Sequence, residues 1–367
     1  MIQFIVRRTL QAIPVIFLIS VVSFLLMQQA PGGPQAAFNQ NPHISPEQVD
    51  AWLRRWCLER NPDLLGTVRE YLGWLGAYNC TGGGFVSDHG LPNLLPAFLG
   101  GGSNGVIHGD FGFSILSGRP VLELIVERLP ATFILMTTAF VIWVTIAVVV
   151  GVLAAVKRYS FFDQAVTFIG YVLYSLPTFW LGLILIFIFG VELHLLPTQG
   201  IIAVRTSPAP FGTPEFWTAF AAKPLPLIQD IAGHLVLPVV TLVAVSIAAD
   251  SRFVRSAMLD TLGQDYVRTA RAKGLPPRSV IFKHAFRNAL LPILTNVALE
   301  IAFLFSGAIV TETVFSWPGM GRLYFEGVSG RDYFLLMGIL LIGSLLVVVF
   351  NIIADVLYAV ADPRIRY

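Results

Sequence analysis

The chain has 367 residues, of which 55% are hydrophobic and only 13% are charged, and its mean hydropathy is +0.73. A soluble globular domain carries roughly 25% charged residues, so this composition excludes an ordinary soluble domain. Long apolar runs, in place of alternating segments of about 10 residues, also exclude a β-barrel. We therefore expect an all-α polytopic membrane protein, to which the formal net charge of +2 adds little.

Six apolar runs are long enough to cross the ~30 Å hydrocarbon core, which takes about 20 helical residues. The first run follows Arg7 and Arg8 and lacks the small-x-small cleavage site of a signal peptide, so we interpret it as an uncleaved span. Asp250 and Arg252 interrupt the end of the fourth run. We place the six predicted spans at 9–29, 131–156, 165–190, 234–256, 288–311 and 333–361.

Lysine and arginine residues gather in the loops on one side of these spans. Fourteen of the twenty-four lie before the first span, at 157–158, between 252 and 287, and in the C-terminal tail. The positive-inside rule places these loops and both termini in the cytoplasm. The chain then divides into a first transmembrane helix (1–30), an extracytoplasmic loop region (31–130), a core transmembrane domain (131–361) with a cytoplasmic segment at 257–287, and a cytoplasmic tail (362–367).

The first outer loop contains two predicted helices. Ser45-Pro46-Glu47-Gln48 has the form of a helix start, with Ser as N-cap and Pro in the first turn. The stretch 82–112 and the second outer loop, 191–233, are expected to be irregular. The second helix has an apolar face that we expect to pack on the protein's own surface, made of Leu64, Leu65, Val68, Tyr71, Leu72 and Leu75.

Both cysteines, Cys57 and Cys80, lie in this first outer loop. The outer side of the membrane is oxidising, so a disulfide can form there. Sequence spacing does not distinguish a disulfide from two unpaired thiols, and both interpretations stay open.

The sequence lacks the motifs of an enzyme. A Walker A loop ends in Gly-Lys-Ser/Thr, whereas the four lysines of this chain follow Val156, Ala222, Ala272 and Phe282. The six histidines show no pairs at metal-ligand spacing, and no G-x-S-x-G nucleophile elbow occurs. We expect no catalytic residue, no bound metal and no ATP hydrolysis by this chain alone.

The most informative segment runs from Asp265 to Pro292, because it is too polar to span a bilayer although it lies between apolar runs. Its first part is predicted to be a helix over 265–273, with Arg268 and Arg271 on one face. Ala270 and Ala272 are small, which lets a helix enter a groove closely.

A break and a second helix follow. Gly274 suits a helix C-cap, and Pro277 can open the next helix, which carries basic residues back toward the membrane. A helix that binds a partner and a basic loop that only sets the topology both fit this pattern.

Several separated motifs resemble the inner-membrane permeases of dipeptide and oligopeptide ABC importers. They occur in the right order over nearly the whole chain, and they are Arg7-Arg8 through Ala30-Pro31-Gly32, Gly109-Asp110-Phe111-Gly112 with Pro120-Val121, Tyr266 to Leu275, His284 to Pro292, Thr311 to Leu323, and Arg331-Asp332-Tyr333. The resemblance implies the MetI-like fold of a type I importer permease, with six spans, in a bacterial or archaeal cytoplasmic membrane.

The same resemblance implies the partners. They are a second homologous permease, one or two cytoplasmic ATPases that bind ATP and Mg, an extracytoplasmic solute-binding protein and the lipid bilayer, with no cofactor on this chain and no nucleic acid. The segment that contacts the ATPase would be a coupling helix made of Tyr266, Arg268, Thr269, Ala270, Arg271, Ala272, Lys273 and Gly274.

The chain departs from the general permease pattern in two places. In the motif EAA, three residues, Gly, nine residues, I-x-LP, only Ala270 and Gly274 fit, and Leu291-Pro292 comes five residues late. The peptide branch commonly departs in this way. The first outer loop, with Cys57, Cys80 and the run 82–107, is longer than the usual loop of the family.

Candidates for the translocation path lie in and after the fifth span. Glu300 and Asn296, one turn apart, either line the path or make a polar contact between helices. Asp250 and Asp355 are predicted to be structural or to brace a gate. Trp317-Pro318-Gly319 cannot be regular helix, and we expect it to border the path as part of an outer gate.

Two other classes of membrane protein are alternatives to an importer permease. A self-sufficient secondary transporter or channel would show buried acidic or histidine relays and usually an internal repeat. The second alternative, a membrane scaffold with no transport role, would not explain the basic segment from Asp265 to Pro292. Within the family, nickel or oligosaccharides are alternatives to peptides as the transported substrate.

Overall fold

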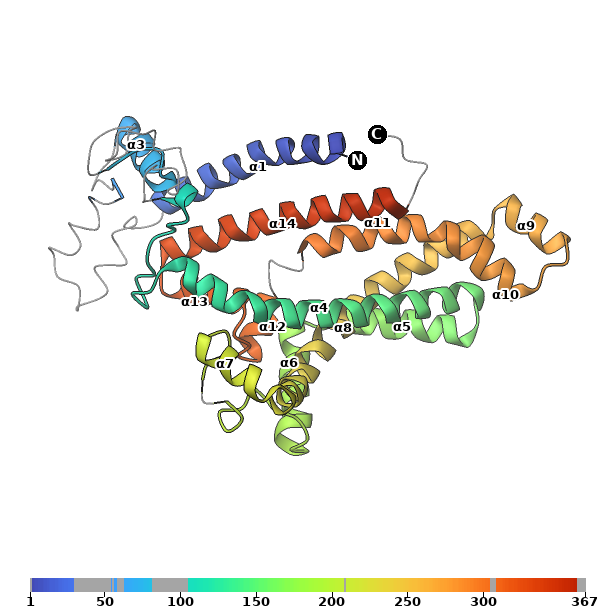
Figure 1. The fold of residues 1–367 in the computed structure, drawn as a ribbon. Coiled ribbons are helices and arrows are strands. Elements are labelled where there is room, and N and C mark those ends of the chain that lie inside the picture. Colours follow the sequence, from blue (N-terminus) through green and yellow to red (C-terminus); the bar gives the residue numbers. More distant parts are fainter. Residues whose placement is uncertain are drawn as a thin grey trace. The chain divides into compact units, whose positions relative to one another are not determined.

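The structure, a computed structural model, describes residues 2–29, 54, 56–57, 63–80, 105–207, 209–303 and 308–361. Figure 1 shows that these residues are mainly helical, with isolated bridges such as that between Phe113 and Pro120. The predicted helix start at 45–48 lies outside them. The chain divides into two compact units. The first is made of Met1–Thr9, Arg128–Arg322 and Leu346–Tyr367, and the second of Leu10–Glu127 and Leu323–Leu345.

Among the residues that the structure describes, four helices are long and apolar enough to cross a membrane. They are α1 (Ile2–Gln29), α4 (Val121–Val156), α8 (Pro224–Leu262) and α14 (Tyr333–Ala361). Helix α14 begins and ends where the sequence predicts. Helices α4 and α8 extend beyond their predicted limits, and Arg252 does not end α8, because its guanidinium lies over the rings of Tyr171 and Tyr174 at 4.9 and 5.4 Å.

The predicted third span is not one straight helix. Helix α5 (Phe161–Ser175) is followed by α6 (Thr178–Leu185) and the π-helix η4 (Ile186–Glu192), with a bend of 98° at the break. Pro177 causes the break, because a proline ring pushes the preceding residue into extended backbone, and Leu176 has ψ 128°. The bent pair could form a fifth span.

The predicted fifth span, 288–311, is also interrupted. Helix α11 covers Arg287–Phe303, and a separate short helix, α12, covers Ile309–Val314. Residues 304–307, between these two helices, lie outside the described residues. The described residues therefore contain four or five candidate spans, and the count of six stays a prediction.

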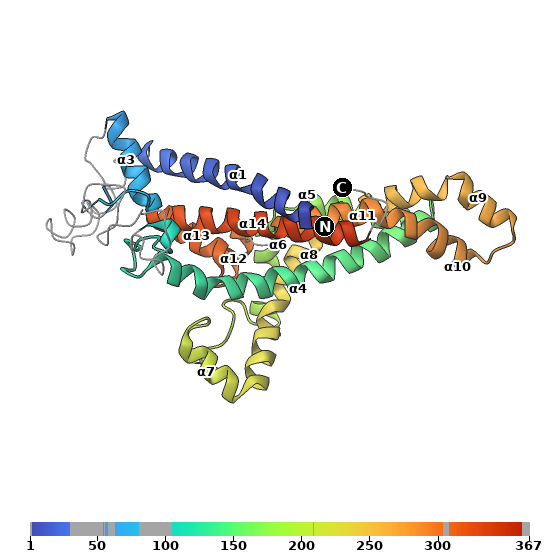
Figure 2. The same cartoon turned by 45° about the horizontal axis from the view of Figure 1, so that its top comes forward.

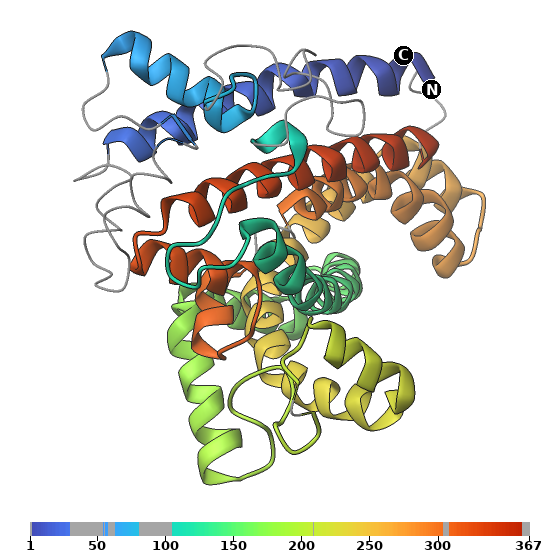
Figure 3. The same ribbon diagram turned by 60° about the vertical axis from the view of Figure 1, so that its left-hand side comes forward.

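The remaining helices are short. In the first unit, α7 (Pro214–Ala222) lies in a loop that the sequence predicts to be irregular, and both α6 and α7 contact α8 (Figure 3). Helix α13 (Met320–Ser329) precedes α14. The outer loop contributes α3 (Leu64–Leu75) and the 3-10 turn η3 (Val106–His108).

The core of the first unit joins α4, α7, α8 and the loop before α7. Its largest members are Trp143, Phe211, Phe216 and Trp317, packed with aliphatic side chains from α4 and α8. Rings from the second outer loop therefore make a buried cluster that holds this loop against α4 and α8.

In the second unit, two motifs of the resemblance meet. The Asp332 carboxylate is fully buried and accepts hydrogen bonds from the Ser114 hydroxyl at 2.6 Å and the Leu335 amide at 3.2 Å. Burial raises the pKa of Asp332, and the Ser114 hydrogen bond opposes that shift. Gly112 has φ +85°, and a Cβ there would lie 2.8 Å from the ring of Phe334. The outer loop is thus fixed to the start of α14.

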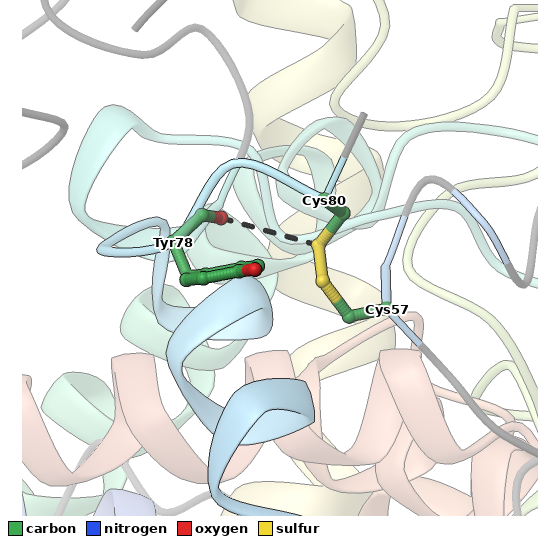
Figure 4. Close-up of a disulfide and its surroundings, with 3 residues drawn as sticks. All are labelled: Cys57, Tyr78 and Cys80. Atoms are coloured by element: carbon green, nitrogen blue, oxygen red, sulfur yellow. Dashed lines mark hydrogen bonds between the residues drawn. A yellow bond between two sulfur atoms is a disulfide. The ribbon is translucent and has the colours of Figure 1, made fainter. Parts of the chain in front are cut away.

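The structure joins Cys57 and Cys80 by a disulfide, with the Cα atoms 5.1 Å apart (Figure 4). The preceding residue, Trp56, is fully buried against the ring of Phe334, at 5.5 Å between centroids. The bond therefore ties the end of α3 to a residue anchored on α14 in the same unit.

Replacing both Cys57 and Cys80 by Ser should lower the free energy of unfolding by about 3 kcal/mol, because the bond closes a loop with a sequence separation of 23 residues. The thermal unfolding midpoint of the purified chain in detergent measures this loss. Reducing agent should lower the midpoint of the parent chain to that of the double variant and leave the variant unchanged.

Candidate functional site

The predicted coupling segment, residues 265–292, begins with a short helix that has one exposed and one buried face. Helix α9 covers Asp265–Ala272 and ends at Lys273. Gly274 follows with φ +70°, and its amide donates to the Arg271 carbonyl at 3.0 Å. The predicted break is present, since Pro277 begins the next helix, α10 (Pro277–Ser279).

The return path is continuous and basic. Helix α10 leads into the π-helix η5 (Val280–Phe286) and then into α11. Figures 1 and 2 show α9 and α10 at the end of the hairpin that α8 and α11 form. The exposed basic side chains of this hairpin end are Arg268, Arg271, Lys273, Arg278, Lys283 and Arg287.

Not all predicted coupling residues are accessible. Ala270 is only 4% exposed, and Val267 is fully buried. The sequence interpretation placed Ala270 with Ala272 on the face that enters a groove, whereas the structure turns Ala270 inward, because α9 needs small side chains to approach the helices beneath it. The exposed face consists of Tyr266, Arg268, Thr269, Arg271, Ala272, Lys273 and Gly274.

The buried face fixes α9 to the rest of the first unit. Val267 and Ala270 belong to an apolar cluster with Val254 and Met258 of α8 and Ile293 of α11; α4 and η5 also contribute to it. Close-packed clusters of this kind transmit displacement instead of absorbing it. A force applied to the exposed face of α9 would therefore move α8 and α11.

An open hollow of ≈ 470 Å³ adjoins this helix. Its lining is mixed, with polar groups from α8, α9 and α11, including Asp260, Gln264 and Asn288, beside the rings of Phe253 and Tyr266. The hollow leaves the N-terminal end of α9 accessible from a second side.

A bidentate ion pair braces the α4–α5 turn against α8. Arg255 of α8 donates from Nε and Nη2 to the two carboxylate oxygens of Asp163 at 2.6 and 2.8 Å. Asp163 lies in the first turn of α5 and also accepts from the Tyr159 amide at 2.9 Å. The Asp163 side chain is 4% exposed, so the pair is shielded from water on that side.

Asp163→Asn should lower the free energy of unfolding by about 3 kcal/mol, because it leaves the Arg255 charge without its bidentate partner. The thermal unfolding midpoint in detergent is the measurement. Asp265→Asn is the matched control, since Asp265 is 96% exposed in its 3.6 Å pair with Arg268 and should contribute less than about 1 kcal/mol. Equal shifts of the unfolding midpoint in the two variants would contradict the conclusion that the Asp163–Arg255 pair stabilises the fold.

The predicted path residues Asn296 and Glu300 lie together with Asp250. The Asn296 amide donates to Glu300 at 2.7 Å on its own helix and to Asp250 of α8 at 3.5 Å. The structure therefore shows the polar contact between helices that the sequence left as one of two interpretations. The void beside Asp250 and Asn296 measures ≈ 10 Å³, too small for a peptide. A role in the path stays a prediction.

The segment Trp317-Pro318-Gly319 is irregular, as predicted, but it is held inside the first unit. Trp317 is fully buried, and its indole donates to the Ala131 carbonyl of α4 at 2.8 Å. Gly319 is also buried, which leaves only Pro318 partly exposed. A gate role for these residues stays a prediction, and their visible contacts are with α4 and α12.

The sequence analysis missed the residue that organises this segment, Glu312 of α12. Its carboxylate is fully buried and accepts from the Thr132 hydroxyl and the Arg322 amide, both at 3.0 Å. Burial raises the pKa of Glu312, and the hydrogen bonds from Arg322 and Thr132 oppose the shift. A Cβ on Gly319 would lie 2.5 Å from this carboxylate. A signal was present, namely an acidic residue followed by Gly319 and Gly321.

Residues 147–367 match the family described as binding-protein-dependent transport system inner membrane component. The oligopeptide transport system permease protein AppB of Bacillus subtilis is 38% identical over 368 residues, covering 100% of both chains. The chain belongs to this permease family.

Two other relatives support the same family assignment. The permease is 35% identical over 371 residues to the dipeptide transport system permease protein DppB of Escherichia coli K12, covering 100% of this chain and 99% of the relative. It is 34% identical over 368 residues to the di/tripeptide transport system permease protein DppB of Pseudomonas aeruginosa, with the same coverage. These matches confirm the resemblance found from the motifs, and the permease is a multi-pass membrane protein of the peptide branch of ABC transporters.

Proposed function

We propose that this permease is one of two homologous membrane subunits of an ATP-driven importer for di- and oligopeptides. A solute-binding protein would deliver the peptide on the outer side, and the two permeases would form the path between them. Cytoplasmic ATPases would bind ATP and Mg, and this chain would bind neither. The names of the relatives support peptides as the substrate.

The observation that carries the proposal is the two-sided construction of α9. Its exposed basic face is available to an ATPase, while Val267 and Ala270 lock its other face to α8 and α11. Closure of the ATPase pair on ATP would push α9 as a lever and switch the spans between inward-facing and outward-facing states. Such a switch needs a two-state element whose equilibrium is shifted from both of the sites that it connects. The α8–α9–α11 assembly can be that element, because α9 packs directly on α8 and α11.

The topology that follows places α9 and both termini in the cytoplasm and the first and second outer loops outside. The loops with most of the arginine and lysine residues then face the cytoplasm. The enlarged first outer loop would border the docking site of the solute-binding protein.

A second candidate, a self-sufficient transporter, is favoured by one observation. Asp250 and Glu300, from two helices, share Asn296, and acidic groups inside membrane helices often belong to ion relays. The importer proposal accounts for the same cluster as a polar contact between α8 and α11.

Mass spectrometry of what co-purifies with the permease from its native membrane, in mild detergent, tests the proposal. We expect one or two P-loop ATPases and a second homologous permease. Recovery of the permease alone, from conditions that keep other transporter complexes intact, would overturn the proposal in favour of the second candidate. A solute-binding protein recovered with the complex can be assayed with peptides, nickel and oligosaccharides, and binding of nickel or a sugar without peptide binding would overturn the substrate class.

A further inference from the structure

Helix α3 exposes the N-terminal half of the apolar face that the sequence predicts to be buried, while Tyr71, Leu72 and Leu75 of that face are half-buried. Leu64 is 82% exposed, Leu65 is 73% exposed and Val68 is 49% exposed. The buried face consists instead of two glycines, a glutamate and a tryptophan, namely Gly66, Glu70, Gly73 and Trp74. Water-soluble proteins bury leucine and expose glutamate, so α3 has the inverse of the pattern expected in water.

The contacts of α3 lie along the membrane-spanning part of α1. The Tyr71 hydroxyl and the Ser20 hydroxyl are hydrogen-bonded at 2.8 Å, and the rings of Trp74 and Phe24 are 6.0 Å apart. The candidate span of α1 ends at Gln29. Ser20 is nine residues before that end, which corresponds to about 13 Å along a helix. Tyr71 therefore reaches a level of α1 that lies within the hydrocarbon layer.

Helix α1 also has apolar side chains that face outward in the same unit. Val22, Leu25 and Leu26 are 46, 42 and 62% exposed. A membrane span covers such side chains with lipid. Arg69, also exposed on α3, has a side chain long enough to extend its charge toward headgroups.

The orientation of α3 about its axis is fixed by close packing. A Cβ on Gly73 would lie 2.6 Å from Sγ of Cys80 and 3.0 Å from Sγ of Cys57, so the disulfide occupies the space beside the buried face. Glu70, also on that face, accepts a hydrogen bond from the Gln28 amide at the end of α1. The leucine face cannot turn inward without breaking these contacts.

We propose that α3 lies within the bilayer beside α1 and that Leu64, Leu65 and Val68 contact the acyl chains of lipid. Amphipathic helices in this position bury their apolar face about 5–10 Å into the boundary between headgroups and acyl chains. The first outer loop is then anchored in the membrane on the side where α1 ends. This anchor holds the surface that borders the docking site of the solute-binding protein at a fixed distance from the membrane.

Spin labels on single cysteines test this proposal. Leu64→Cys, Leu65→Cys and Val68→Cys are made in the full chain, within its transporter complex in lipid nanodiscs. The native cysteines are joined, so the parent chain should take up no label. Collision rates with oxygen, which concentrates in lipid, and with a water-soluble nickel chelate are compared. Leu26→Cys on α1 is the lipid control, and Glu215→Cys on α7, exposed and polar, is the aqueous control.

All three positions should show the oxygen-dominated ratio of Leu26, and peptide uptake by the same variants in proteoliposomes should be retained as a check on folding. A nickel-dominated ratio like that of Glu215 would place the face in water and overturn the proposal. Low rates with both reagents would also overturn it, because protein, either a second subunit or another part of this chain, would then cover the face.

Discussion

Gly274→Trp should reduce peptide uptake by at least about tenfold while the complex continues to hydrolyse ATP. Gly274 is exposed at the end of α9, and no atom lies within 4 Å of the Cβ that a side chain would add. An indole there has room within this chain, so its steric effect falls on whatever docks against α9. A tenfold effect corresponds to only about 1.4 kcal/mol of lost docking free energy.

The positive φ of Gly274 requires a matched control, because any other residue there is strained. Gly118 has φ +67°, compared with +70° for Gly274, and also has no atom within 4 Å of an added Cβ. Gly118→Trp carries the same strain in the outer loop and should leave coupling intact. Uptake and ATP hydrolysis are measured on both variants in proteoliposomes. Normal uptake in Gly274→Trp, or equal losses in both variants, would count against the lever hypothesis.

Glu312→Ala should lower the free energy of unfolding by about 3 kcal/mol or more. The change leaves the Thr132 hydroxyl and the Arg322 amide without their carboxylate acceptor in a buried site, and each unsatisfied buried group costs about 1–3 kcal/mol. It also removes the atoms against which Gly319 packs. We expect the segment between α12 and α13 to lose its ordered structure and the variant to lose peptide uptake as a result.

Two further variants make this result specific. Glu312→Gln keeps the shape and one acceptor oxygen, so its thermal unfolding midpoint should fall between those of the parent and Glu312→Ala. Glu215→Ala replaces an exposed glutamate of α7 and should change the midpoint little. A Glu312→Ala variant with the parent's midpoint would show that the buried hydrogen bonds do not support the segment.

For the predicted coupling segment, the largest difference between the prediction and the structure concerns its faces. Helical spacing and the Gly-Leu-Pro-Pro break predict the two helices and the turn correctly. Spacing alone could not show which side of α9 packs inward, because alanine and valine fit either a partner's groove or the chain's own core. Contacts with Met258 and Ile293, far away in sequence, decide that Val267 and Ala270 are buried.

A similar difference concerns the spans. Hydropathy finds the positions of all the long helices, but averaging over a window conceals the break at Pro177 and the non-helical backbone of Ala308. In α3 the apolar stripe is predicted correctly, but only Tyr71, Leu72 and Leu75 are half-buried and Leu64, Leu65 and Val68 are exposed, because periodicity gives a face without giving the medium that it contacts.

The sequence by itself determined that this protein is a helical membrane permease of the peptide branch, because long apolar runs, their flanking arginines and separated motifs are local properties of the chain. Only the tertiary structure decided which charges are buried and paired. Glu312 with Thr132, Asp163 with Arg255, and Asp250 with Asn296 each join residues more than forty positions apart. The physical reason is that a polar group in an apolar interior is stabilised by a polar partner that lies beside it in the folded structure. The two partners are far apart in the sequence, so the sequence alone does not show which residues form the pair.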